Sequence, residues 1–175
     1  MMTPAAGVKL TVGQPFPEIQ VERRKKNGRI ITCTLSGAAF RQVQIGIVLS
    51  LPRCTNKTDK AHLSSFNEHS QTFKNLNCRI VVITSEDTTF ASFLPKLVLK
   101  NSALVSDVKR NYGSKTGLKI DDYHTLTDLD YSLARSCVIV RNGIVEAVSV
   151  ETNKDECTVT SAAATIEKIQ EIMKK

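Results

Sequence analysis

Thiols are the side chains of this sequence best suited to redox chemistry, and they occur at five positions: Cys33, Cys54, Cys78, Cys137 and Cys157. Their number is odd and no pair has the Cys-x-x-Cys spacing, so the pattern predicts neither a disulfide scaffold nor a zinc site. The histidines His62, His69 and His124 form no cluster with ligand spacing. We therefore expect no metal and no other cofactor.

The surroundings of the thiols differ along the chain. Cys33, Cys78 and Cys137 lie in or beside strand-like apolar runs, where a thiol is usually a small, inert core residue. Cys54 lies in a polar loop that runs from Ser50 to Lys57. A loop thiol keeps a pKa near the free value of about 8.5, which leaves only a few per cent as thiolate at neutral pH.

Length, composition and charge describe a folded domain. Apolar residues make up 41% of the 175 residues and charged residues 23%, which predicts a single domain over residues 1–175. No apolar run approaches the roughly 20 residues of a membrane span, and the N-terminus lacks the pattern of a signal peptide. We therefore expect no membrane segment and a cytoplasmic location.

The net charge of +7 is the strongest compositional bias. It is spread along the chain apart from two clusters, Arg23–Lys26 and Lys174–Lys175. A basic surface could favour an acidic partner or nucleic acid. Aromatic residues are only 5% of the chain, so the stacking platform of a nucleic-acid-binding module is not favoured.

Apolar runs and turn residues predict alternating strands and helices. Val8–Val12 is expected to be a strand, and an Asn27-Gly28 type I′ turn to close a hairpin between Ile19–Lys26 and Arg29–Leu35. The later elements are expected as follows: buried strands at Val43–Leu49, Arg79–Ile83 and Ala103–Val105; a helix from Thr58 or Asp59 to Phe73; a helical turn at Asp107–Tyr112; a polar loop at 114–132; a hairpin of Ser136–Val140 and Ile144–Val150; and a last helix from Thr160 or Ser161.

This order predicts an α/β fold: a mixed, thioredoxin-like sheet flanked by helices, with an N-terminal β-hairpin. Buried strands joined by helices form right-handed parallel units, and the terminal hairpin adds antiparallel strands.

Four stretches in this order resemble the thiol peroxidase subgroup of the peroxiredoxins. They cover most of the chain: Val12-Gly13 with Pro17; Leu49–Pro52 followed by Ser65–Glu68; Ser85–Ala91; and Leu133–Ser136. The resemblance implies the peroxiredoxin type of thioredoxin-like fold and a homodimer. It also implies a peroxidase in which a Pro-x-x-x-Thr-x-x-Cys motif opens the active-site helix. An arginine from a distant strand and the helix N-terminus would lower the thiolate pKa there, and a resolving cysteine would close a disulfide that a thioredoxin-type reductant opens.

The chain departs from this motif at the residues that carry the chemistry. Pro52 matches the proline and Arg135 the arginine, but Asn56 stands where threonine belongs and Asp59 where the attacking cysteine belongs. Counted from Phe90, the resolving position holds Lys96. A carboxylate cannot be oxidised to a sulfenic acid, so the two-cysteine cycle cannot run from these positions.

Two interpretations follow, and a third is weaker. In the first, the protein is catalytically impaired and acts as a binding or structural module, with Asp59 either paired to Arg135 or capping the helix in solvent. In the second, Cys54 and Arg135 are the catalytic residues of a one-cysteine thiol peroxidase, and Pro52, Asn56 and Asp59 contact its substrate. A nucleic-acid-associated role is the least favoured.

Overall fold

The computed structural model describes residues 7–53, 56–87, 89, 94, 96, 102–121 and 131–175. Its elements, in chain order, are β1 (Ile19–Arg24), β2 (Ile30–Leu35), the 3-10 helix η1 (Gly37–Phe40), β3 (Ile45–Leu51), α1 (Lys57–Glu68), α2 (Ser70–Asn75), β4 (Cys78–Thr84), β5 (Ala103–Ser106), α3 (Asn111–Thr116), β6 (Lys119–Asp121), β7 (Tyr131–Leu133), β8 (Ser136–Arg141), β9 (Ile144–Val150) and α4 (Ala162–Met173).

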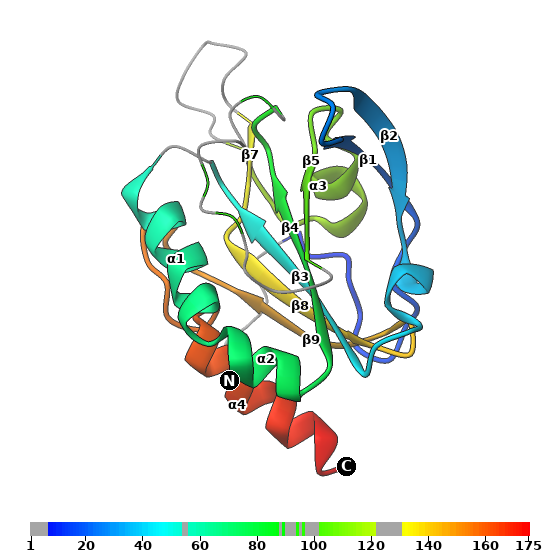
Figure 1. Ribbon diagram of the computed structural model, residues 1–175, viewed down its shortest axis with the longest axis vertical. Helices are drawn as coiled ribbons and strands as arrows, with labels where there is room; N and C mark the ends of the chain where they lie inside the picture. Colours follow the sequence, from blue (N-terminus) through cyan, green and yellow to red (C-terminus); the bar gives the residue numbers. More distant parts are fainter. Residues whose placement is uncertain are drawn as a thin grey trace.

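A mixed sheet forms the centre of the molecule (Figure 1). Within the described residues its strand order is β2-β1-β5-β4-β3-β8-β9. The strands β3, β4 and β5 are parallel, and β8, β9 and the β1–β2 hairpin pair antiparallel. β6 and β7 form a separate two-stranded ladder. The predicted mixed sheet with flanking helices and an N-terminal β-hairpin is thereby confirmed.

The side chains of β3 point alternately to the two faces of the sheet, and the core accordingly has two layers. Ile47 and Leu49 pack with side chains of α1, α2 and α4 on one face of the sheet. Val48, between them, packs on the other face with Phe40 of η1 and Tyr112 of α3. Successive side chains of a strand point to opposite faces, and every residue of β3 is buried. Apart from Ser50, the residues of β3 are apolar because helices cover both faces of the strand.

The two Asn-Gly turns differ. At the β8–β9 turn Asn142 and Gly143 both have positive φ (54° and 80°), as a type I′ turn requires. At the β1–β2 turn only Gly28 has a positive φ (82°), and its N–H donates to the Lys25 carbonyl. This is a three-residue loop with a left-handed glycine, so the predicted type I′ turn at Asn27-Gly28 is wrong.

Some predicted elements form elsewhere. Val8–Val12 is not a strand, and its neighbour Gly13 instead donates a backbone hydrogen bond to Val145. The helical turn expected at 107–112 begins only at Asn111, because Arg110 has a left-handed φ of 60°. The 114–132 segment is not only loop, since the C-terminal half of α3 and the ladder of β6 and β7 form at its two ends.

Helix caps explain where the other helices start. Asn56 caps α1 through a hydrogen bond that its Oδ1 accepts from the Asp59 N–H at 2.7 Å, so the predicted caps, Thr58 and Asp59, lie inside the helix. The predicted Ser161 cap of α4 is confirmed, since its hydroxyl accepts from the Ala164 N–H. None of the described helices is long and apolar enough to cross a membrane.

Candidate functional site

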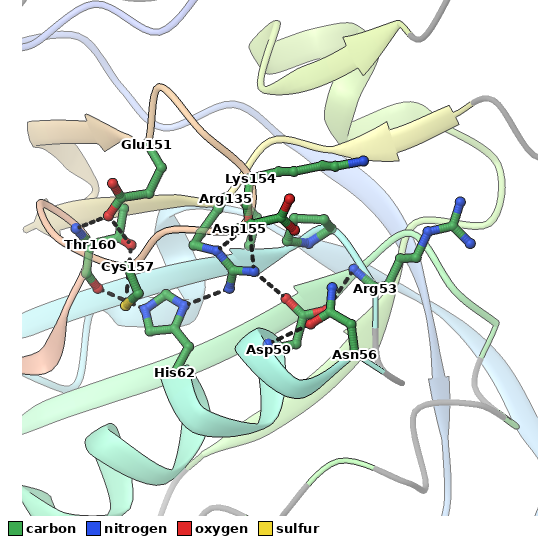
Figure 2. Close-up of polar contacts among 12 residues, drawn as sticks. Arg53, Asn56, Asp59, His62, Arg135, Glu151, Lys154, Asp155, Cys157 and Thr160 are labelled. Atoms are coloured by element: carbon green, nitrogen blue, oxygen red, sulfur yellow. Dashed lines mark hydrogen bonds and ion pairs between the residues drawn. The ribbon is translucent and has the colours of Figure 1, made fainter. Parts of the chain in front are cut away.

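Arg135 occupies the buried centre of a polar cluster between α1 and the loop that follows β9 (Figure 2). It follows β7 and immediately precedes β8, so the sheet fixes its backbone. Its Nη2 donates to Asp59 Oδ1 at 2.6 Å, and its Nη1 lies 3.0 Å from His62 Nδ1. Its Nε and Nη2 both donate to the Lys154 carbonyl, at 3.0 and 2.9 Å. The guanidinium therefore joins α1 to the β9–α4 loop.

Asp59 lies in the first turn of α1, and its side chain is fully buried. An acidic residue is favoured there because the exposed N–H groups of a helix N-terminus carry partial positive charge. Its second carboxylate oxygen accepts the backbone N–H of Arg53 at 3.1 Å. The predicted Asp59–Arg135 ion pair is confirmed, and the alternative of a carboxylate capping the helix in solvent is wrong.

His62 lies on the same face of α1 as Asp59, three residues further along. Its Nε2 is 2.8 Å from the Thr160 carbonyl oxygen, which can only accept, so Nε2 carries the proton. Nδ1 is then the acceptor for the Arg135 N–H. Both neighbours of the ring thus require the neutral imidazole with its proton on Nε2.

The β9–α4 loop is held in shape by Glu151. Its carboxylate accepts hydrogen bonds from the backbone N–H and the hydroxyl of Thr158 and of Thr160, at 2.6 to 2.8 Å. Cys157, in the same loop, has its Sγ 3.9 Å from the Thr160 hydroxyl. The loop therefore presents the Lys154 and Thr160 carbonyls to the cluster from a fixed backbone.

Burial dominates the electrostatics of the cluster. Burial raises the pKa of Asp59 to about 6, although Arg135 acts in the opposite direction. Burial, with a smaller contribution from Arg135, lowers the pKa of His62 to about 4. Burial opposes ionisation of Glu151 too, but the hydrogen bonds from Thr160 and Thr158 outweigh it and lower its pKa. At neutral pH the cluster is a carboxylate–guanidinium pair beside a neutral imidazole.

The other predicted site residues lie near this cluster or outside the described residues. Pro52 is buried directly after β3, and its carbonyl accepts a hydrogen bond from the Ser85 hydroxyl. Asn56 caps α1 and its side chain faces the Asp59 N–H. Cys54 lies outside the described residues. Lys96 is exposed, and its carbonyl accepts a hydrogen bond from the Asn67 side chain.

Four participants were missed by the sequence reasoning: His62, Glu151 and the carbonyls of Lys154 and Thr160. A signal for His62 was available, because a residue three positions after Asp59 shares its helix face. The Lys154 carbonyl belongs to the backbone, and because every residue has such a group, the residue type gives no signal for it. Within the described part of the chain, no group of three or more His, Cys, Asp or Glu side chains is arranged to hold a metal ion.

The family model for Redoxin matches residues 11–166, which is most of the chain. The chain belongs to the Redoxin family. The matched range includes the whole cluster around Arg135, from the first turn of α1 to the loop before α4. The resemblance seen in the four sequence stretches is thus confirmed at the level of the family.

Several solved structures similar to this Redoxin-family chain are peroxiredoxins of low sequence identity. Reduced Prx3 from Vibrio vulnificus has a TM-score of 0.75 and 16% identity, covering 92% of this chain and 99% of its own. Peroxiredoxin 5 from Alvinella pompejana has a TM-score of 0.73 and 16% identity, and the match covers 93% of this chain and 99% of that peroxiredoxin. The mitochondrial 2-Cys peroxiredoxin from Plasmodium falciparum has a TM-score of 0.67 and 19% identity, and the match covers 93% of this chain and 94% of that peroxiredoxin. These likenesses show that the fold is that of the peroxiredoxins. No curated protein matches the chain at a significant level.

Proposed function

We propose that this Redoxin-family protein does not run the two-cysteine peroxidase cycle and serves as a binding or structural module. The observation that carries the proposal is the contact between Asp59 and Arg135, 2.6 Å apart with both side chains fully buried. The family resemblance puts the attacking cysteine at position 59. There the chain keeps a negative charge for the arginine but has no sulfur to oxidise.

The described thiols support the proposal, because none has the lowered pKa of a reactive cysteine. Burial raises the pKa of Cys78 and of Cys137 to about 12. Burial also raises the pKa of Cys33 and of Cys157. At Cys157, the contact with Thr160 and the charge of Arg135 lower the pKa, but they offset only part of the effect of burial. Each of these thiols is protonated at neutral pH, whereas peroxide attack requires the thiolate.

The bonding of Arg135 also supports the proposal. All three of its guanidinium nitrogens already contact groups of the protein, and only 1% of the residue is exposed. An arginine that orients a peroxide must direct free N–H groups into an accessible pocket. Here the guanidinium connects two segments of the chain, which is a structural role. We also propose a cytoplasmic homodimer, and a thioredoxin-type reductant only if a thiol proves active.

Trapping of sulfenic acid tests the proposal. The reduced protein is treated with hydrogen peroxide and a dimedone-type reagent, and labelled cysteines are located by mass spectrometry over time. We expect slow labelling, well below stoichiometric, spread over several cysteines. Fast stoichiometric labelling at Cys54 that disappears in Cys54→Ser would overturn the proposal in favour of a one-cysteine peroxidase.

An Asp59→Cys variant examines the same proposal from the opposite direction. A thiol at the start of α1, beside Arg135, would have its pKa lowered by the cation and by the helix N-terminus. We expect residue 59 of this variant to be trapped faster than any native cysteine. If the native cysteines are trapped equally fast, the absence of sulfur at position 59 is not what limits the reaction.

A further inference from the structure

β2 is an edge strand without charged residues. It stands at one end of the strand order, pairs only with β1 (Figure 1), and in the described part of the chain residues 30–35 make no backbone hydrogen bond outside that ladder. Its sequence is Ile-Ile-Thr-Cys-Thr-Leu, in which four of six residues are β-branched and therefore suited to strands. Ile30 is 50% exposed. Such an edge is a template for pairing with another strand.

The ladder identifies which residues of β2 direct their backbone outward. The Lys25 N–H donates to the Arg29 carbonyl at 2.9 Å, so this pair closes the hairpin. Hydrogen-bonded and non-hydrogen-bonded pairs alternate in an antiparallel ladder. The next pair, Arg24 with Ile30, is therefore non-hydrogen-bonded, and so is the pair of Glu22 with Thr32. The N–H and C=O of Ile30 and Thr32 consequently face away from β1.

Five basic residues surround the start of this edge, and we call them the basic turn: Arg23, Arg24, Lys25, Lys26 and Arg29. All five are exposed. None forms an ion pair with an acidic side chain of the described residues. Five unneutralised cations within seven positions produce a strong local positive potential.

Protection against aggregation does not account for this arrangement. Where charged residues or proline protect an edge strand, they lie on the strand itself. Here the cations lie in and beside the turn, and the strand between Ile30 and Leu35 has none. The β2 strand of a second copy is disfavoured as the occupant of this edge, because it has no acidic residue to complement the basic turn. An acidic strand is complementary to both the open backbone and the charge.

We propose that the β2 edge and the basic turn form a docking site for an extended acidic segment of a partner protein. The segment adds as a strand alongside β2, exchanging backbone hydrogen bonds with Ile30 and Thr32. Its carboxylates face the basic turn, and an apolar residue covers Ile30. This inference is independent of the proposed function, since the site lies on the strand at the end of the sheet and uses no residue of the Arg135 cluster.

Binding of a fluorescein-labelled synthetic peptide that alternates Glu with Val tests the proposal by anisotropy at low salt. Thr32→Pro removes an outward N–H that the β1 ladder does not use, and Thr32→Val keeps it. We expect Thr32→Pro to weaken binding by about ten-fold, the loss of one or two backbone hydrogen bonds, while Thr32→Val binds like the wild type. Thermal melts of both variants verify that they fold. Equal binding by the two variants would overturn strand addition.

A second pair of variants tests the charge. We expect Lys25→Gln/Lys26→Gln/Arg29→Gln to weaken binding by about ten-fold at low salt, an effect that decreases as salt screens it. The matched triple variant Lys60→Gln/Lys74→Gln/Lys174→Gln, at exposed sites on α1, on α2 and at the C-cap of α4, should bind within about two-fold of wild type. Equal losses would assign the binding to net charge. Tighter binding of a single-stranded RNA than of the peptide, or self-association abolished by Thr32→Pro, would also overturn the proposal.

Discussion

Arg135 is a buried cation that contacts groups of the protein through all three of its guanidinium nitrogens. Its guanidinium connects two segments: it contacts the first and second turns of α1 through Asp59 and His62, and the β9–α4 loop through Lys154. A buried charge is tolerated only when it is paired and its hydrogen bonds are satisfied. Because Asp59 supplies the charge and the loop supplies a carbonyl, the arginine is stable here without a thiolate.

Removing the arginine should therefore cost more than removing an ordinary surface ion pair. Arg135→Ala leaves the Asp59 carboxylate buried without its partner, and we expect a loss of about 3–5 kcal/mol in the free energy of unfolding at neutral pH. Arg141→Ala is the matched control, since Arg141 pairs with Glu146 at 3.0 Å with a side chain 34% exposed. That variant should lose no more than about 1 kcal/mol. Urea unfolding measures both, and equal losses would contradict a structural role for the buried pair.

At the scale of elements, the strands of the central sheet could be predicted, whereas the ladder of β6 and β7 and some helix boundaries could not. β3, β4 and β8 contain the continuously apolar runs 45–49, 80–83 and 137–140, because both faces of the sheet are covered. The start of α3 depends instead on a side chain that precedes the helix: the Asp107 carboxylate accepts the N–H groups of Tyr112 and Gly113, at 2.7 and 3.0 Å. A cap that reaches over five and six residues leaves no pattern in the local sequence.

The contact between β3 and η1 depends on a glycine in the strand. A Cβ on Gly46 would lie 2.3 Å from two ring carbons of Phe40, which is fully buried. We expect Gly46→Ala to lower the free energy of unfolding by about 1–3 kcal/mol through overpacking. Phe40→Leu shortens the ring side chain, so the double variant should lose less than the sum of the two single variants. Additive losses in urea unfolding would mean that the two residues do not press on each other.

For the whole molecule, the family pattern predicted the pairing of Asp59 with Arg135 but not the network around it. The pair joins residues 76 positions apart, and only the resemblance brought them together. The spacing of the histidines excluded His62 as a metal ligand and indicated no other role for it, and its actual partners, Arg135 and the Thr160 carbonyl, lie 73 and 98 positions away. Contacts of this kind depend on how the β9–α4 loop folds back onto α1, which the sequence alone does not indicate.

The same network couples global stability to pH through two opposing titrations. Asp59 has a folded-state pKa raised to about 6, above the ordinary value of about 3.9. Its contribution to stability is therefore present at low pH and is lost as pH rises through 6. His62 has a folded-state pKa lowered to about 4, below the ordinary value of about 6.5. Its contribution is present above pH 6.5 and is lost as pH falls toward 4.

Between about pH 4 and 6 the two contributions change in opposite directions, so they nearly cancel in the wild type. His62→Gln removes one of them, while its side-chain amide can still donate to the Thr160 carbonyl. We expect the free energy of unfolding of this variant, relative to wild type, to rise as pH falls from 6.5 to 4, by at most about 1.4 kcal/mol per pH unit. Urea unfolding at a series of pH values measures the difference in the free energy of unfolding between variant and wild type. The contributions of the other titrating groups cancel in this difference. A difference that is constant with pH would mean that His62 binds its proton equally well in the folded and unfolded chains, and that the neutral imidazole required by Arg135 and Thr160 is not imposed by the fold.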